Sequence, residues 1–261
     1  MTPRSLSAVP LLDVFYREFY QDPLFNAFYR GSGYANFGYW DANIADPAAA
    51  GDRLVEKLLE FLPERRGKIL DVACGHGAST KYLSRFFKAR NITGIGIVPA
   101  QIESARQRAP KCRFTVMDAT TLDFRADRFD VVICVEAAFH FQTRARFFAE
   151  AFRVLKPGGY LLLSDLLMAF RAPLAPRENH LADARAYADL LKRIGFKRVK
   201  VCNATDETWL SFRKAFGHFM ATQRIGDALS LNGLRDMFTI NVNSSWAIRG
   251  YVLAAARKPR H

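Results

Sequence analysis

Short apolar runs that end in polar or glycine-rich turns recur through the middle of the chain, and each run predicts a buried strand. The first run covers residues 69–72 and breaks into the turn Cys74-Gly75-His76-Gly77, behind which Ala78 can start a helix. This order predicts a buried parallel strand that leads into a tight turn and a helix. The other apolar runs predict strands over residues 91–97, 114–119, 129–136, 196–202 and 246–254, with another beginning near Tyr160.

Helical spacing of apolar residues predicts helices at three places outside these strands. Residues 8–30 repeat apolar side chains at helical intervals and predict one or two amphipathic helices. A further helix is expected near residues 182–194. Residues 205–243 are too long for a tight hairpin and contain helical patterns rich in aromatic residues such as Trp209 and Phe212. We expect this segment to form a helical cap over the carboxyl ends of the strands, a place that suits substrate selection.

The glycine-rich turn predicts a nucleotide-like cofactor at the first strand–helix crossing. Gly75 and Gly77 carry no Cβ, so a ligand can approach the backbone, and the helix behind them presents unpaired N–H groups to an anion. A dinucleotide site of the Gly-x-Gly-x-x-Gly type has a third glycine, but Thr80 stands in its place here. The turn therefore favours a cofactor other than a dinucleotide.

Residues 71–77, Asp-Val-Ala-Cys-Gly-His-Gly, resemble the first motif of the class I S-adenosylmethionine-dependent methyltransferases, with Ala73 in place of its first glycine. Blocks similar to the later motifs of this family follow in the same order, among them Arg-Val-Leu-Lys-Pro-Gly-Gly-Tyr at residues 153–160. The resemblance implies a Rossmann-like α/β sheet of seven strands, the last antiparallel, with an N-terminal helical lid and a helical cap between strands six and seven. It also implies S-adenosylmethionine as the cofactor.

The resemblance assigns cofactor contacts to the ends of the strands. The positions expected at the methionine end of the cofactor are Asp71, Ala73, Gly75 and Gly77. The positions expected at the adenine and at the end of the fourth strand are Asp118, Ala119 and Val135.

The ribose contact departs from the usual pattern of the family. Many relatives hold the two ribose hydroxyls with an acid at the position of Gly96. Some small-molecule methyltransferases lack this acid and use the Gln of a Pro-x-Gln segment, which makes Gln101 the candidate ribose ligand. The alternative interpretation of Gln101 is a polar residue on the first turn of a helix.

Residues 33–40, Gly-Tyr-Ala-Asn-Phe-Gly-Tyr-Trp, are similar to the aromatic segment that precedes the core in methyltransferases of sterols, tocopherols, polyketides and glycosylated natural products. There the aromatic side chains close over the cofactor, so Tyr34 and Tyr39 are candidates for that contact. An aromatic packing cluster would explain each of these tyrosines equally well.

Methyl transfer to a hydroxyl needs a base, and His140 is the candidate because it lies just past the fourth strand. Related sugar O-methyltransferases carry a His-His pair in this loop, whose first position is Phe139 here, and an Asp directly after the fifth strand, matched by Asp165. The sequence therefore proposes Asp165 as the carboxylate that orients His140. Packing or capping roles are the alternatives for both. Glu136 could hold the methionine amino group or a substrate cation, or could simply mark the end of the strand.

Composition limits the remaining choices. A chain of 261 residues with 50% hydrophobic residues can bury one substantial core. No apolar run is long enough to span a bilayer, and the cysteines are read as free thiols, which favours a cytoplasmic protein; they are Cys74, Cys112, Cys134 and Cys202. The scattered histidines give no support for a metal site. The net charge of +13 is compatible with nucleic acid, an anionic membrane or an acidic substrate.

We therefore expect four segments: a lid over residues 1–45, a cofactor-binding core over 46–204, a cap over 205–243, and a final strand with a basic tail over 244–261. The predicted function is O-methylation of a hydrophobic small molecule, which could be anionic, by a chain that could form a homo-oligomer. The alternatives are C-methylation of an anionic lipid or prenyl diphosphate, methylation of RNA, and a cyclase or scaffold that binds the cofactor without transferring methyl. Nucleic acid is the less favoured partner because the basic residues are dispersed.

Overall fold

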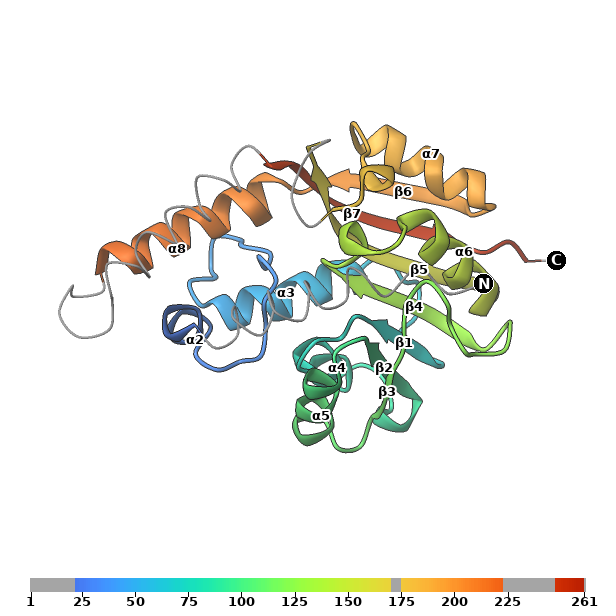
Figure 1. The fold of residues 1–261 in the computed structure, drawn as a ribbon, viewed down its shortest axis with the longest axis horizontal. Helices are drawn as coiled ribbons and strands as arrows, with labels where there is room; N and C mark the ends of the chain where they lie inside the picture. The colour runs from blue at the N-terminus through green and yellow to red at the C-terminus, as the bar shows by residue number, and fades with distance from the viewer. Residues whose placement is uncertain (1–21, 170–174, 223–246, 261) are drawn as a thin grey trace, which may run out of the picture.

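The computed structural model describes residues 22–169, 175–222 and 247–260, and a seven-stranded sheet runs through them (Figure 1). The strand order is β3-β2-β1-β4-β5-β7-β6; β7 is antiparallel to both of its neighbours, and the other adjacent strands are parallel. The strands are β1 (Ile69–Val72), β2 (Ile92–Gly96), β3 (Arg113–Val116), β4 (Phe129–Val135), β5 (Leu155–Met168), β6 (Lys197–Asn203) and β7 (Ile248–Arg257). The topology confirms the fold predicted from the sequence motifs.

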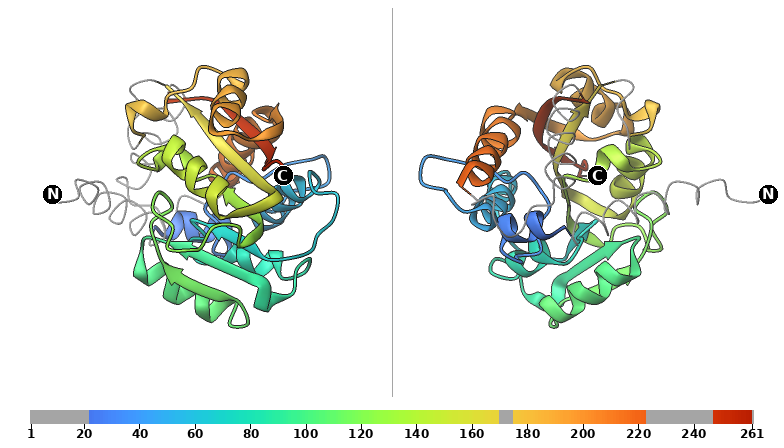
Figure 2. Two further views of the ribbon diagram at one scale, coloured as in Figure 1. Left: turned by 90° about the vertical axis from the view of Figure 1, so that its right-hand side faces the viewer. Right: turned by 60° about the vertical axis from the view of Figure 1, so that its left-hand side comes forward.

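Helices cover both faces of the sheet, as Figures 1 and 2 show. The described helices are α2 (Pro23–Tyr29), α3 (Pro47–Leu59), α4 (Ala78–Leu83), α5 (Pro99–Arg108), α6 (Arg144–Val154), α7 (Ala184–Ile194) and α8 (Ser211–Thr222). Short helical turns η1 (Ala89–Asn91), η2 (Ala138–His140), η3 (Arg177–Asn179) and η4 (Asp206–Leu210, a π-helical turn) complete them. Both α3 and α4 pack on one face of the sheet, and α6 and α7 pack on the other.

Successive side chains of the central strands point to opposite faces of the sheet, and each face packs into one half of the core. In β4, Val131 and Ile133 point to the face that carries α3, whereas Val132 and Cys134 point to the face that carries α6 and α7. Both faces are buried, which is why the sequence of β4 reads as a continuous apolar run.

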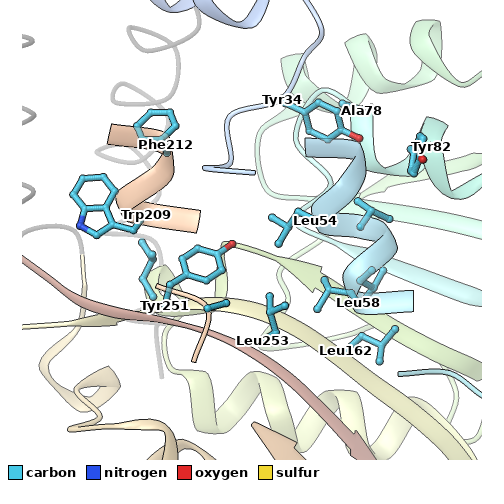
Figure 3. Packing of buried hydrophobic residues seen from close by; sticks show 14 of the residues in the cluster. Tyr34, Leu54, Leu58, Ala78, Tyr82, Leu162, Trp209, Phe212, Tyr251 and Leu253 are labelled. Carbon is cyan, nitrogen blue, oxygen red and sulfur yellow. The ribbon is translucent and has the colours of Figure 1, made fainter. Parts of the chain in front are cut away.

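Aromatic side chains join the segments before and after the central strands. Phe28 of α2 packs edge-to-face against Phe212 and Phe216 of α8, with ring centroids 5.7 and 5.0 Å apart. Figure 3 shows Tyr251 of β7 between Trp209 and Phe212 on one side and the helix that carries Leu54 on the other. The described parts of the predicted lid and cap therefore pack on each other as well as on the sheet.

Two further sequence predictions are confirmed, and others fall partly outside the described residues. The helix expected near residues 182–194 is α7, and all four cysteines are free thiols. Residues 8–21 of the predicted N-terminal helices and residues 223–243 of the predicted cap lie outside the described residues. Over the described part of the chain, no helix has the length and apolar character needed to cross a membrane.

Candidate active site

The turn between β1 and α4 is built from backbone conformations that favour glycine. Gly75 and Gly77 have φ values of 51° and 79°, and Ala73, where the family has glycine, has φ of 57°. The N–H of Cys74 donates to the carbonyl of Ile95 on β2 at 3.0 Å, which fixes the start of the turn against the sheet. A residue with a Cβ pays a conformational cost in this region, so Ala73 holds a strained backbone at the turn.

Gly75 and Gly77 have different surroundings. Gly75 lines a cleft at the carboxyl ends of the strands. Gly77 is not among the residues that line this cleft, and a Cβ on it would lie 2.8 Å from the Cβ of Ala105 on α5. Its missing side chain therefore allows α4 and α5 to pack closely, and its contact with a ligand stays a prediction.

Asp71 stabilises the turn by joining the strand before it to the helix after it. It is buried on β1, and its Oδ2 accepts hydrogen bonds from the hydroxyls of Ser79 at 2.9 Å and Thr80 at 2.6 Å. Burial raises the pKa of the Asp71 carboxyl to about 6, although the two hydroxyls favour its ionised form. Asp71 thus ties the end of β1 to the first turn of α4, and it is not among the residues that line the cleft.

The cleft occupies about 920 Å³ with its open mouth included. Its walls come from the ends of β1, β2 and β4, from the first turns of α4 and α5, and from residues 33–36. The predicted site residues that line it are Tyr34, Ala73, Gly75, Gly96, Gln101, Val135 and His140. Open α/β sheets bind ligands at this position because the strand order reverses there, here between β1 and β4.

The ribose and adenine candidates are placed differently. Gly96 and Gln101 both line the cleft, and a Cβ on Gly96 would meet nothing closer than the Ile102 side chain at 3.5 Å. Asp118 and Ala119 are outside the cleft lining. The Oδ1 of Asp118 accepts from the backbone N–H and the hydroxyl of Thr120 at 2.7 and 2.9 Å, so one of its oxygens serves a local turn.

The two lid tyrosines are separated by the structure. Tyr34 lines the cleft, and its hydroxyl donates to Asp52 on α3 at 2.6 Å. Burial raises the pKa of Tyr34 well above its ordinary value, so the phenol is neutral. Tyr39 lies outside the cleft lining with Lys57 5.2 Å from its ring centroid, and its backbone N–H bonds to Ala50. These contacts favour the packing interpretation of Tyr39, and its contact with the cofactor stays a prediction.

Glu136 is the cleft residue whose role the sequence left undetermined. Its backbone is left-handed with φ of 55°, and its carboxylate accepts from the backbone N–H of Phe37 at 3.0 Å and from the hydroxyl of Tyr251 at 2.8 Å. These contacts join residues 37, 136 and 251, so Glu136 fastens the aromatic segment and β7 to the end of β4. Burial raises the pKa of Glu136 to about 8, against the effect of both hydrogen bonds. No local pattern could reveal partners this far apart in sequence.

His140 lies in the cleft wall on η2, at the end of β4. Its ring packs against that of Phe139, with 3.7 Å between centroids. The loop around it is held by Asn179, whose side-chain amide donates to the carbonyls of Phe139 and Phe141 at 2.9 and 2.7 Å. The backbone that carries His140 is thus tied down on both sides.

Asp165 supports the same loop through its backbone. Its Oδ1 accepts from the backbone N–H of Phe139 at 3.1 Å, and its Oδ2 accepts from Nε of Arg144 at 2.7 Å and from the Tyr187 hydroxyl at 2.9 Å. Asp165 has no exposed surface and is outside the cleft lining. Asp165 is therefore a buried residue that positions the His140 loop through the backbone, and a role of its carboxylate in orienting the imidazole stays a prediction.

Comparison with known proteins agrees with this geometry. Residues 70–163 match the model of a family described as "Methyltransferase domain". The chain is 29% identical to the erythromycin 3''-O-methyltransferase of Saccharopolyspora erythraea, over 87% of this chain and 84% of that protein. It is 32% identical to the O-methyltransferase cnsE of Penicillium expansum, over 65% and 67% of the two chains.

Solved structures share the fold. The crystal structure of the [4+2]-cyclase SpnF aligns with a TM-score of 0.75 at 24% identity over 96% of both chains. Phosphoethanolamine N-methyltransferase 2 of Haemonchus contortus, solved with S-adenosyl-L-methionine, aligns with a TM-score of 0.70 at 20% identity over 100% of this chain and 62% of that one.

Fold, cleft and relatives together define a class I S-adenosylmethionine-dependent methyltransferase, and this chain belongs to that family. It is an enzyme that methylates small molecules, and S-adenosylmethionine is its cofactor. The cleft suits such a cofactor because Ala73, Gly75 and Gly96 line it with little or no side chain. Within the described ranges, no group of His, Cys, Asp or Glu side chains forms a metal site.

Proposed function

We propose that this enzyme transfers a methyl group to a hydroxyl oxygen of a hydrophobic small molecule, with His140 as the general base. The observation that carries the proposal is the place of His140: the imidazole lines the same cleft as the glycine turn, on a loop whose backbone is held by Asn179 and Asp165. The erythromycin and cnsE relatives are both named O-methyltransferases, which supports oxygen as the acceptor atom.

The lining of the same cleft supports a set of proposed cofactor contacts. Ala73, Gly75 and Tyr34 would lie along the methionine end, Gly96 and Gln101 beside the ribose, and Val135 along the wall between them. Asp118 and Ala119 at the end of β3 stay the candidates for the adenine. When bound, S-adenosylmethionine supplies an electrophilic methyl group, so the protein must align the acceptor and exclude water.

The protein itself must remove the proton of the acceptor hydroxyl and enclose the reacting groups in the cleft. His140 would accept the proton of the acceptor hydroxyl, and neutral imidazole suits this task near neutral pH. Glu136 would keep the aromatic segment closed on the cleft through the Phe37 N–H, with Tyr251 holding the same carboxylate from β7.

Charge in the cleft argues against the alternative of a prenyl diphosphate or another anionic acceptor. The described residues that line the cleft include Glu136 and His140 but no Lys or Arg. A diphosphate needs cationic or metal partners, and the described lining offers neither. A neutral, apolar acceptor fits the lining better, because Tyr34, Val135 and Phe141 are among the residues that line the cleft.

The proposal is tested by methyl transfer from radiolabelled S-adenosylmethionine to a panel of apolar alcohols and phenols and to a metabolite extract. Label in an ether product that is alkali-stable supports the proposal, and its loss in His140→Gln with cofactor binding retained supports the base. Label in RNA or on carbon would contradict it. Cofactor binding without turnover on any acceptor would favour a cyclase or scaffold.

A further inference from the structure

The amino-terminal edge of the sheet, opposite the cleft, carries a row of cations. The five mutually parallel strands β1–β5 start at this edge, and a Lys or Arg stands at or within two residues of each start. In the spatial order β3, β2, β1, β4 and β5 these residues are Arg113, Arg90, Lys68, Arg128 and Lys156. Adjacent strands lie about 4.8 Å apart, so the first four cations spread over about 14 Å.

The row opens into two adjoining hollows that share Lys68 and Arg128. One hollow is also lined by Arg90 and Arg113 and the other by Arg125, and their volumes with open mouths are about 500 and 1040 Å³. The cations therefore surround concave space that a ligand can enter.

Nearby acids do not neutralise this group. Asp130 is paired with Lys156 at 2.8 Å and also accepts the backbone N–H of Lys68, while Asp127 is paired with Lys258 at 2.7 Å. Among the cations of this edge, five have no ion pair with another described residue: Lys68, Arg90, Arg113, Arg125 and Arg128. Like charges brought together destabilise a fold, so an unneutralised group of five is the arrangement expected of an anion site.

The side chain of Arg128 is held in place by two aromatic rings. Its guanidinium lies 4.7 Å from the ring centroid of Phe124 and 5.4 Å from that of Phe129. Stacking on two rings limits the freedom of the side chain before any ligand arrives, which lowers the entropic cost of binding.

We propose that this edge is a second binding site, for a small ligand that carries two or more phosphate groups. A spread of about 14 Å exceeds what one phosphate can contact and suits several in a chain. The concave form favours a small ligand over a flat macromolecular surface. A membrane is disfavoured because the strongly exposed large apolar side chains of the described residues are Val116, at the opposite end of β3, and Leu210 of η4.

The test is calorimetric titration of the full chain with inorganic tripolyphosphate at 0.15 M salt. Wild type is expected to bind one equivalent, and the triple variant Lys68→Gln, Arg90→Gln, Arg113→Gln is expected to bind about a hundredfold more weakly or not at all. The matched control removes three exposed cations elsewhere: Arg185→Gln, Arg193→Gln, Lys214→Gln. It should keep the wild-type affinity within about threefold. Both triple variants should bind S-adenosylmethionine as wild type does, which shows that they are folded.

Three results would overturn the proposal. These are no binding by wild type, equal weakening in both triple variants, and binding of phosphatidylglycerol vesicles or single-stranded RNA that tripolyphosphate does not displace. The last result would assign the edge to a membrane or a nucleic acid.

Discussion

Asp165 and Arg144 form a salt bridge of 2.7 Å in which neither side chain has any exposed surface. The two terminal nitrogens of the Arg144 guanidinium donate hydrogen bonds to the backbone carbonyls of Asn179 and Leu166. A buried pair is strongly destabilising to break because the surviving charge loses its partner. The pair therefore fastens β5, α6 and η3 around the loop that carries His140.

Asp165→Asn should destabilise the protein by about 3–5 kcal/mol because Arg144 would keep a buried, uncompensated charge. Urea denaturation measures the effect. Asp189→Asn is the control, because Asp189 and Lys192 form an exposed pair whose loss should cost less than about 1 kcal/mol. Similar losses in the two variants would contradict the structural role of Asp165.

His140→Gln should lower kcat by about 10²–10⁴-fold, the usual contribution of a general base, while the Kd for S-adenosylmethionine changes little. Single-turnover methyl transfer and cofactor titration separate the two effects. A variant that loses cofactor binding in proportion to activity would show that His140 serves the cofactor and not the acceptor.

Glu136→Gln should change how stability depends on pH. The folded-state pKa of Glu136 is raised from 4.5 to about 8, so the folded protein holds this proton more tightly than the unfolded chain. The raised pKa stabilises the fold below about pH 4.5, and that stabilisation is lost as pH rises through about 8. Glutamine does not titrate, so between pH 5 and 8.5 wild type should lose about 1–4 kcal/mol relative to the variant. Urea denaturation at both pH values measures this, and parallel profiles would contradict it.

Ala73→Gly should leave the protein unchanged in stability or up to about 1 kcal/mol more stable. Glycine removes the left-handed strain at φ of 57°, and this gain offsets its greater freedom in the unfolded chain. Ala188→Gly, within α7, is the control and should cost about 1 kcal/mol. Thermal or urea denaturation decides, and an equal loss in both variants would show that Ala73 is not strained.

Gln101→Ala should raise the Kd for S-adenosylmethionine about tenfold through the loss of a ribose hydrogen bond. Gln107→Ala is matched to it because Gln107 is exposed on the same helix, and its effect should stay within about twofold. Isothermal titration measures both. Equal affinities in the two variants would restore the interpretation of Gln101 as a helix-surface residue.

Local patterns were sufficient for the sheet and for much of the cleft. The apolar runs of β1 and β4 and the glycine turn after β1 are short-range signals, and parallel strands bring their carboxyl ends to one edge. The sequence alone therefore predicted positions near one another for Gly75, Gly96 and Gln101, and all three line the cleft. The sequence could not show which neighbours a residue packs against, such as Ala105 beside Gly77.

The sequence by itself determined the family, the cofactor and the strand-end positions around it, because these follow from residues close together in the chain. Only the tertiary structure decided the partners of buried polar groups. Asp165 reads as a catalytic carboxylate in sequence but is saturated by Arg144, Tyr187 and Phe139, and Glu136 reads as a strand end but joins Phe37 to Tyr251. A buried polar atom takes whichever donors the packing brings to it, and in these two cases the donors lie 21 to 115 residues away along the chain.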